Sequence, residues 1–514
     1  MSRTRLAGWT AVALTGLAAS PCVAQTTWLV SNDPSENPDF TSPQAALGAL
    51  AVQAGDTVLV SEGSGPYLFN SQSIVGRDAL SIRAEPGETP VFRSVAGQSQ
   101  TMLRVDSADV RVEGIRFEDS QPQGQGRAAV SGAGARLLIQ SCDFVSFVTT
   151  SAVFLRANGK ITGCRFIECN SPTAALSLGE GAGSVEACSF VTSNPASHAG
   201  AFLFALGLDP VLIRCLFAGG PVIQTPANPF GFGYDARFIG CTFTDATLRP
   251  DQNLFRVWIE HVSLESCLFA RIESLAPALC TVRFSAVSMT NCTLWDVTAN
   301  TLVAVDFTGN LTTIRNTVFW ENAIANPWED VGTIEHTIAA DVPFGLGNLT
   351  SDPLFNNPAH GDFTPRRGSP AIDSANTAVV GADVLLDAGG RPRRVDDPIM
   401  PDTGVGAAPI VDRGAYEFPI PTNCPADLTT TAVPGAAGYG VPNGILNNDD
   451  FFYYLTLYSG TIGTCGVLPG QNHCPSPPDF TATSVPGLLG YGILDGAINS
   501  DDFFYYLQLF VAGC

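Results

Sequence analysis

Lysine is almost absent from this sequence of 514 residues. Lys160 is the only lysine among 26 basic residues, and 48 acidic residues bring the formal net charge to −22. A surface that binds nucleic acid needs a basic footprint, so this composition argues against nucleic acid as a partner. The same charge opposes a polyanionic polysaccharide unless calcium bridges the two. Long apolar runs are also lacking beyond the N-terminal region, so no later segment predicts a membrane-spanning helix.

Residues 1–24 have the pattern of a secretory signal peptide. Arg3 and Arg5 precede an apolar stretch over residues 6–19, and residues 22–24 offer a small-residue cleavage site before Gln25. We therefore expect the protein to be secreted, and to be extracellular or at the cell surface. The remaining chain is long enough for one large domain and one small domain.

A Cys-x-Phe phrase recurs through the middle of the chain. It occurs as Cys142-Asp143-Phe144, Cys164-Arg165-Phe166, Cys188-Ser189-Phe190, Cys215-Leu216-Phe217, Cys241-Thr242-Phe243 and Cys267-Leu268-Phe269, with related phrases at Ile115, Cys292 and Thr317. Successive phrases lie 22 to 27 residues apart, a spacing that is typical of solenoids. In a strand, residues two positions apart share a face, so the Cys and Phe of each phrase are expected to point inward together.

A second short apolar segment precedes each phrase, as at residues 153–155, 202–204 and 303–305. Two or three strands in each coil, without helical periodicity, predict a mainly β fold. The expected architecture is a right-handed parallel β-helix over residues 25–420, with a cap at each end. The competing architecture, a leucine-rich repeat, would require a recurring Leu-x-x-Leu-x-Leu-x-x-Asn frame, which does not occur.

Distinct segments flank this predicted solenoid. Residues 27–31 predict an opening strand and residues 43–50 a short helix, while the far end carries three further phrases, at residues 351–355, 368–373 and 411–418. Together these segments resemble secreted pectate-lyase-like β-helix proteins, and the last three resemble the choice-of-anchor Q group among them. The resemblance implies the fold, export and a polysaccharide partner. It leaves catalysis open, because the group includes both lyases and binding proteins.

Candidate catalytic residues follow from the same resemblance. Residues 257–261 read Val-Trp-Ile-Glu-His, similar to the V-W-I-D-H motif of pectate lyases but with Glu in place of Asp. A lyase needs a base, usually Arg or Lys, and a cation that stabilises the charge formed beside a carboxylate. Glu260 and His261 are candidates from this phrase. Arg256 and Arg283 are candidates because they lie beside the strands of neighbouring coils, where they could line one outward face and supply the base. The alternative is a non-catalytic structural or adhesive solenoid, in which this Trp packs on the coil and the Glu-His turn is solvated.

A polysaccharide lyase is a better match than a glycoside hydrolase if the protein is an enzyme. Hydrolases of this fold use paired or triple Asp residues, and their Asn-Thr-Asp, Gly-His-Gly and Arg-Ile-Lys phrases are absent here. The partner motif of the lyases, Arg-x-Pro-x-x-Arg, is absent as well. The sequence thus leaves open whether the protein is an enzyme.

The cysteines of the repeated phrase predict a ladder of small buried side chains. A metal or redox role is disfavoured, because neither a Cys-x-x-Cys pair nor a histidine-rich cluster accompanies them. Four further cysteines flank the C-terminal repeats. Their preferred pairing as disulfides is Cys424 with Cys465 and Cys474 with Cys514, and the other two arrangements remain open.

The last ninety or so residues contain one phrase twice, at residues 427–458 and 479–510. The two copies are offset by 52 residues, and 19 of 32 positions are identical. Each copy has an Asn/Asp-Gly-x-x-Asn-x-x-Asp segment before an apolar run, which is the spacing of the second half of an EF-type calcium loop. The remaining ligands, an Asp-x-Thr pair, lie sixteen residues before the first of these, so each loop would carry a twelve-residue insertion. The predicted calcium ligands are Asp427, Thr429, Asn443, the Ile445 carbonyl, Asn447 and Asp450, and Asp479, Thr481, Asp495, the Ala497 carbonyl, Asn499 and Asp502.

Residues 424–514 resemble the paired calcium loops of dockerins, specifically a dockerin-like anchor that ends in Gly-Cys, as Gly513-Cys514 does here. The resemblance implies two calcium ions, a small α-helical module and docking onto a cohesin-like protein or a cell-surface scaffold. The split loop and the Thr at the third ligand position depart from the family pattern. The alternative is a pair of helical hairpins that binds no metal.

Overall fold

The computed structural model describes most of the chain from Gln25 to Ala512. The residues outside this description are 1–24, 96–99, 121–127, 133–135, 148–150, 156–158, 170–173, 180–182, 194–200, 206–209, 225–235, 258–259, 284, 307–311, 343–344, 367, 396–399, 420–425, 430, 435–438, 441–445, 462–477, 487, 489–490, 494–496 and 513–514. The predicted signal peptide therefore lies outside the described residues, as do all four cysteines of the predicted disulfides.

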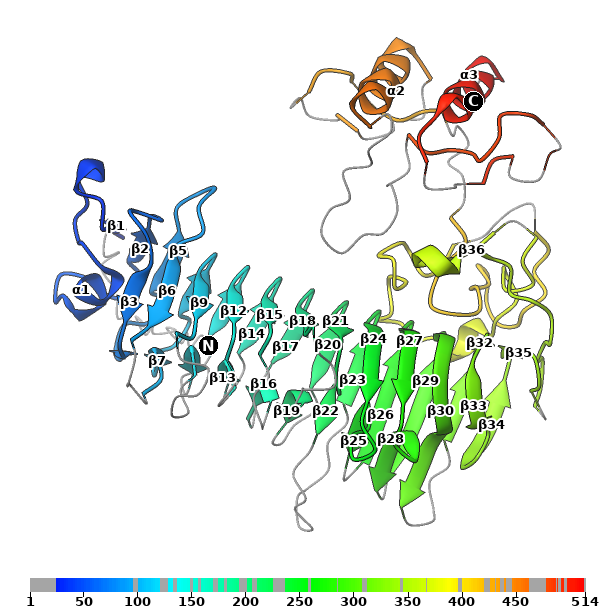
Figure 1. Cartoon of the computed structure of the whole chain (residues 1–514), viewed down its shortest axis with the longest axis horizontal. Helices are drawn as coiled ribbons and strands as arrows, with labels where there is room; N and C mark the ends of the chain where they lie inside the picture. Colours follow the sequence, from blue (N-terminus) through cyan, green and yellow to red (C-terminus); the bar gives the residue numbers. More distant parts are fainter. Residues whose placement is uncertain are drawn as a thin grey trace, which may run out of the picture.

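The main body is a parallel β-solenoid, which confirms the predicted fold class (Figure 1). Each coil contributes one strand to a 13-stranded sheet and further strands to a 22-stranded sheet. The larger sheet consists of two ladders that meet in the long strand β30 (Thr293–Asp306), which pairs with both β27 and β28. A typical coil therefore has three strands, and the predicted solenoid architecture is correct.

The strands of the 13-stranded sheet are β1 (Thr27–Val30), β2 (Thr57–Val60), β5 (Ser81–Ala84), β8 (Arg111–Glu113), β11 (Leu138–Gln140), β14 (Lys160–Thr162), β17 (Ser184–Glu186), β20 (Val211–Ile213), β23 (Ala236–Ile239), β26 (Glu260–Glu265), β29 (Ser285–Thr290), β31 (Thr312–Arg315) and β34 (Val331–Glu335). One ladder of the larger sheet contains β3 (Tyr67–Phe69), β6 (Val91–Ser94), β9 (Arg116–Glu118), β12 (Asp143–Val145), β15 (Arg165–Ile167), β18 (Ser189–Val191), β21 (Leu216–Ala218), β24 (Thr242–Leu248), β27 (Leu268–Ser274), β32 (Val318–Trp320) and β35 (Ile338–Ala339). The other contains β4 (Gln72–Ile74), β7 (Leu103–Val105), β10 (Val130–Gly132), β13 (Val153–Leu155), β16 (Ala174–Leu178), β19 (Ala201–Ala205), β22 (Ile223–Gln224), β25 (Phe255–Val257), β28 (Ala278–Arg283) and β33 (Ala323–Asn326).

Single residues in the left-handed conformation form the corners of the coils. The residue before each repeated cysteine has a positive φ: Ser141, Gly163, Ala187, Arg214, Gly240, Ser266 and Asn291. Four residues after six of these cysteines a second positive φ follows, at Ser146, Glu168, Gly219, Asp245, Arg271 and Asp296. Most of these strands, the one that follows Cys188 excepted, are therefore bounded by two sharp bends. Only some of these positions hold Gly, Asn or Asp, the residue types that adopt this conformation most readily.

The repeated cysteines and phenylalanines fill the interior, as predicted. The cysteine side chains are almost completely buried, and each Sγ lies close to backbone carbonyl oxygens; that of Cys215 is 3.5 Å from the Ile213 oxygen and 3.6 Å from the Val185 oxygen. The nine cysteines that the structure describes are all free thiols. Thr317 takes the cysteine position on the next coil, where its Oγ1 accepts the Cys292 amide at 3.3 Å.

The phenylalanine rings form a continuous stack along the solenoid. The ring centroids of Phe144 and Phe166 are 4.9 Å apart, and those of Phe166 and Phe190 are 4.5 Å apart with an interplanar angle of 6°. The same strand register continues the stack through Phe217 and Phe243, whose centroids are 5.3 Å apart. Aromatic contacts of this kind stabilise by about 0.5–1.5 kcal/mol each beyond the burial of their area.

Both ends of the solenoid are capped. At the N-terminal end, β1 and the helix α1 (Pro43–Gly48) occupy the positions predicted for an opening strand and a short helix. At the other end the chain forms the 3-10 helices η3 (Pro358–His360) and η4 (Thr377–Val379) and the antiparallel pair β36 (Phe355–Asn357) and β37 (Asp362–Pro365). A further 3-10 helix, η1 (Pro34–Glu36), follows β1.

Two asparagines attach the C-terminal cap to the last coils. The Asn316 side chain accepts the Asn376 amide at 2.8 Å and donates to the Asn376 carbonyl at 2.9 Å and to Asn291 Oδ1 at 3.1 Å. Asn291 in turn donates to the Asp412 carbonyl at 2.7 Å. Buried asparagine amides that are hydrogen-bonded at both ends fix the cap in one position on the solenoid.

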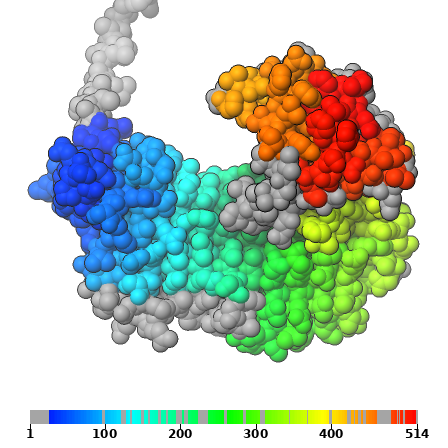
Figure 2. Space-filling model, turned by 45° about the horizontal axis from the view of Figure 1, so that its top comes forward, coloured from blue at the N-terminus to red at the C-terminus, as the bar shows by residue number. Residues whose placement is uncertain are grey.

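The C-terminal module contains the helices α2 (Asn448–Thr461) and α3 (Ser500–Ala512), one in each predicted repeat. Figure 2 shows these helices, in orange and red, over the capped end of the solenoid. Tyr491 and Tyr505 of the second repeat line a cavity together with Arg366 and Phe418 of the cap. Among the described residues, no helix has the length and apolar character needed to cross a membrane.

A strained corner predicts a stabilising substitution. Ala187 is exposed and has φ +51°, so Ala187→Gly would relieve a left-handed conformation with little loss of buried area. We expect a gain of up to about 1 kcal/mol in the free energy of unfolding, since the relief exceeds the entropy cost of glycine. The matched control is Ala175→Gly in β16, where a buried side chain is lost and destabilisation of at least about 0.5–1 kcal/mol is expected. Denaturant titration of both variants checks this, and equal losses of stability would contradict it.

Candidate functional site

The first candidate site lies where α2 begins. Asp450 is completely buried, and its Oδ1 accepts the amides of Leu428 and Thr429 at 2.7 and 2.8 Å. Its Oδ2 accepts the Asn447 amide at 2.9 Å, while Asn447 Oδ1 accepts the Asp449 amide at 2.6 Å in the first turn of the helix. A carboxylate at a helix N-terminus is stabilised by the helix dipole and by these amides. Asp450 thereby joins the helix to the segment that begins the repeat.

The second repeat reproduces this geometry at the start of α3. Asp502 is also completely buried, and its Oδ1 accepts the amides of Phe480 and Thr481 at 2.7 and 3.0 Å. Its Oδ2 accepts the Asn499 amide at 2.9 Å, and Asn499 Oδ1 accepts the Asp501 amide at 2.7 Å. The sequence repeat is thus a structural repeat in which equivalent atoms have equivalent partners.

The threonine of each repeat holds the inserted segment in place. Thr429 Oγ1 accepts the Gly440 amide at 2.8 Å and the Thr431 amide at 3.3 Å, and donates to the Thr431 carbonyl at 2.6 Å. Thr481 makes the corresponding bond to the Gly492 amide at 2.7 Å. These bonds occupy both lone pairs and the hydrogen of the Thr429 hydroxyl. The structure therefore assigns the threonines a role in closing the loop, and their role as metal ligands stays a prediction.

The charge of the module fits a bound cation. Asp427 and Asp479 are buried, like Asp450 and Asp502, and no Lys or Arg follows Arg413 in the sequence. Buried carboxylates need hydrogen bonds and a compensating positive charge, and calcium prefers oxygen ligands such as these. Oδ2 of Asp450 accepts one amide, which leaves a lone pair available.

The structure describes only some of the predicted calcium ligands. Asn443, Ile445 and Asp495 lie outside the described residues. Ala497 lies in the segment that leads to α3, and the structure describes it. Within the described part of the chain, no group of three or more His, Cys, Asp or Glu side chains is arranged to hold a metal ion. The full ligand set therefore stays a prediction.

Two equivalent tyrosines connect the repeats. Tyr454 of α2 and Tyr506 of α3 are completely buried, and their rings stack at a centroid distance of 3.8 Å and an angle of 12°. Burial, with the charge of Asp502 as a second cause, raises the pKa of Tyr454. Burial and the charge of Asp450 raise the pKa of Tyr506. Each tyrosine thus lies near the carboxylate of the other repeat, so the two candidate sites share one core.

The predicted catalytic residues lie in two different sheets. Arg256 is exposed in β25 and pairs in register with Thr281 of β28, the strand that also contains Arg283. Glu260 and His261 lie in β26 of the 13-stranded sheet, and residues 258–259 between β25 and β26 lie outside the described residues. The predicted motif therefore spans two sheets, with the arginines in one and Glu260 and His261 in the other. The catalytic assignment stays a prediction.

Comparison with protein families finds no family model that matches the chain, and comparison with curated proteins finds no match. Solved structures with similarity include the pectate lyase Pel9A, at 12% identity over 77% of this chain and 97% of that chain, with a TM-score of 0.40. A second is the tailspike protein gp49 from Acinetobacter baumannii bacteriophage Fri1, a capsular polysaccharide depolymerase, at 12% identity over 63% of this chain and 60% of that chain, with a TM-score of 0.35. A third is a mannuronic acid specific polysaccharide family 6 lyase from human gut microbiota, at 11% identity over 64% of this chain and 92% of that chain, with a TM-score of 0.31. Similarity at this level assigns the chain to no family.

The hydroxyl groups of the stacked tyrosines differ in their hydrogen bonds, so we expect different effects when each tyrosine is replaced by Phe. Tyr454 Oη is buried without a hydrogen-bond partner among the described residues, whereas Tyr506 Oη lies 3.4 Å from the Ala426 carbonyl oxygen. We expect Tyr454→Phe to stabilise the module by about 1 kcal/mol, because it removes an unsatisfied buried hydroxyl. Tyr506→Phe is the matched control and should be neutral or destabilising by up to about 1 kcal/mol. Thermal loss of the helical circular dichroism signal reports both, and destabilisation by Tyr454→Phe would show that its hydroxyl has a partner.

Proposed function

We propose that the protein is an exported, polysaccharide-associated solenoid that its C-terminal module attaches to a cohesin-like protein or cell-surface scaffold in a calcium-dependent manner. The observation that carries the proposal is the pair of buried aspartates in each repeat of a segment that has no Lys or Arg. Burying carboxylates costs free energy, and a bound divalent cation would offset part of that cost.

In this proposal, calcium would be held by oxygen atoms of each repeat. In the first repeat these include the carboxylates of Asp427 and Asp450 and the side chain of Asn447. The bound ion would supply positive charge between the start of the repeat and the start of the helix. The chain's own part is to hold the carboxylates in place, and the amides of Leu428 and Thr429 already do so for Asp450.

Exposed apolar side chains support a protein partner for the module. Phe452 and Phe504 occupy equivalent positions in the two helices and are 56% and 53% exposed. Val433 and Val485, also equivalent to each other, are exposed as well. Contiguous exposed apolar patches mark surfaces that another protein covers, and the proposal assigns these side chains to such a surface.

The proposal for the solenoid rests on its regularity. Parallel coils repeat their outward-facing positions along the axis, which suits an extended polymer with a repeating unit. The solved structures named above include a pectate lyase, a capsular polysaccharide depolymerase and a polysaccharide family 6 lyase. Arg256 and His261 lie in different sheets, and this placement favours the non-catalytic alternative over a lyase.

Calcium titration of the mature full-length protein by calorimetry tests the anchor. We expect two bound ions in the wild type and one in Asp450→Asn, because the substitution removes the central charge of the first site. The matched control is Asp449→Asn, which changes the neighbouring charge in the same helical turn and should leave two ions. Chelation should lower the thermal stability of the helices.

Two results would contradict the calcium assignment. One is the absence of binding to the folded wild-type protein, and the other is an unchanged stoichiometry in Asp450→Asn with retained helical circular dichroism. Because Asp450 also accepts three amides, Asp427→Asn serves as a second variant for which a similar loss of one ion is expected.

A screen of polysaccharides tests the role of the solenoid. The mature protein would be incubated with neutral and uronate-containing polysaccharides, with calcium or with chelator, while retention and the formation of unsaturated and reducing ends are followed. Retention without cleavage is the result expected for a binding solenoid. Calcium-dependent unsaturated products would establish a lyase and make Arg256 and Arg283 the first residues to replace. The absence of both retention and cleavage would contradict an association with polysaccharide.

A further inference from the structure

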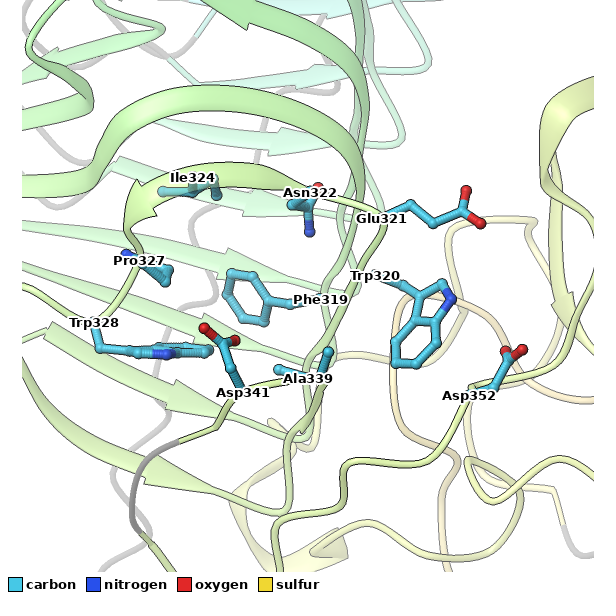
Figure 3. Close-up of a pocket in the computed structure, with 11 residues that line it drawn as sticks. Phe319, Trp320, Glu321, Asn322, Ile324, Pro327, Trp328, Ala339, Asp341 and Asp352 are labelled. Carbon is cyan, nitrogen blue, oxygen red and sulfur yellow. The ribbon is translucent and has the colours of Figure 1, made fainter.

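A cavity of about 510 Å³ lies at the C-terminal end of the solenoid, where the coils end. Its walls come from β32, from the segment after β33 and from the residues after β35 (Figure 3). The Phe319 ring, the last of the interior phenylalanines, meets Trp328 edge-to-face at 5.2 Å. The figure shows Phe319 and Trp328 on one side of the cavity and Trp320 on the other. The indole rings of Trp320 and Trp328 therefore both line the cavity at the end of the solenoid.

Three carboxylates border the same cavity. They belong to Glu321, Asp341 and Asp352, all of which are exposed. Glu321 is held in place, because its Oε2 accepts the Trp295 indole N–H at 2.7 Å. None of the described residues that line the cavity is Lys, Arg or His. The cavity is therefore lined both by negative charges and by aromatic rings.

The hydrogen-bonding groups of the lining are mainly acceptors. Both ends of the Asn322 amide are used inside the protein, by the Val297 amide at 2.9 Å and the Leu294 carbonyl at 3.0 Å. The Trp328 indole N–H is buried and has no partner among the described residues. A ligand that fits must consequently donate hydrogen bonds to the carboxylates, accept one from the Trp328 N–H and carry no negative charge. A uronate would face three carboxylates without a cation between them.

We propose that this cavity binds a protonated amino sugar unit of a polysaccharide. The apolar face of a pyranose ring packs on an indole, and an ammonium group satisfies the carboxylates while the aromatic faces attract its charge. The net charge of −22 would raise the local concentration of such a cationic polymer. The inference rests on the proposed association with polysaccharide and names the class of sugar that this cavity selects.

The test compares three probes of equal length that differ in charge. A glucosamine tetramer, an N-acetylglucosamine tetramer and a galacturonate tetramer are titrated into the mature full-length protein, and binding is followed by calorimetry and tryptophan fluorescence. We expect the glucosamine tetramer to bind at least tenfold more tightly than its N-acetylated counterpart, and the galacturonate tetramer not to bind. The affinity for glucosamine should fall as salt is raised, because exposed charges are screened.

Variants locate the binding to the cavity. Asp341→Asn and Asp352→Asn each remove one exposed charge and should weaken glucosamine binding several-fold without affecting folding. Asp251→Asn removes an exposed charge that does not line the cavity and is the matched control. Trp328→Phe keeps a ring against Phe319 while removing the indole N–H, and should also weaken binding.

The possible results distinguish binding of an amino sugar in this cavity from a general association of the solenoid with polysaccharide. Equal affinity for the acetylated tetramer, calcium-dependent binding of galacturonate, or glucosamine binding that is unchanged in Asp341→Asn and Asp352→Asn would each overturn the assignment. Retention of another polysaccharide by the wild type and by these variants alike would also overturn it, yet would leave the association of the solenoid with polysaccharide intact.

Discussion

The stacking of inward side chains between two left-handed corners is the constraint on which the solenoid depends. A strand of three residues cannot be stable alone, and in a parallel coil its hydrogen bonds go to the coils before and after it. The phenylalanine stack fixes the register of these bonds, because a slip by one residue would turn every buried ring to solvent. The thiols beside the rings fit the narrow interior and lie against backbone carbonyls, as Cys215 does at 3.5 Å.

On the outer surface of the coils, basic side chains form ion pairs with acidic side chains of neighbouring coils. Lys160, the only lysine, pairs with Glu186 at 2.7 Å, and Arg165 pairs with Asp143 at 2.5 Å across neighbouring coils. A pair near the surface such as Lys160–Glu186 contributes about 0.2–1 kcal/mol, whereas in the second pair the Asp143 side chain is buried and only Arg165 is exposed. The positive charge of these coils is thus used in local ion pairs.

The C-terminal module is organised by buried negative charge rather than by apolar stacking alone. Asp450 and Asp502 each join a helix start to the beginning of a repeat, and Tyr454 and Tyr506 stack between them. Since each tyrosine lies near the carboxylate of the other repeat, a change of charge in one repeat acts on the core of both. The exact duplication of these contacts explains why the two sequence copies retain the same residues at the same spacing.

The sequence by itself determined the coil period, the inward positions and the duplicated module, because these follow from local spacing and side-chain chemistry. Only the tertiary structure decided which residues turn the corners, since an alanine such as Ala187 adopts a left-handed conformation when the neighbouring coils require it. It also placed Arg256 and His261 in different sheets although they are close in sequence. The cavity that joins Trp328 to Asp352 was equally hidden in the sequence, because it exists only where the last coil ends and the cap folds back against it.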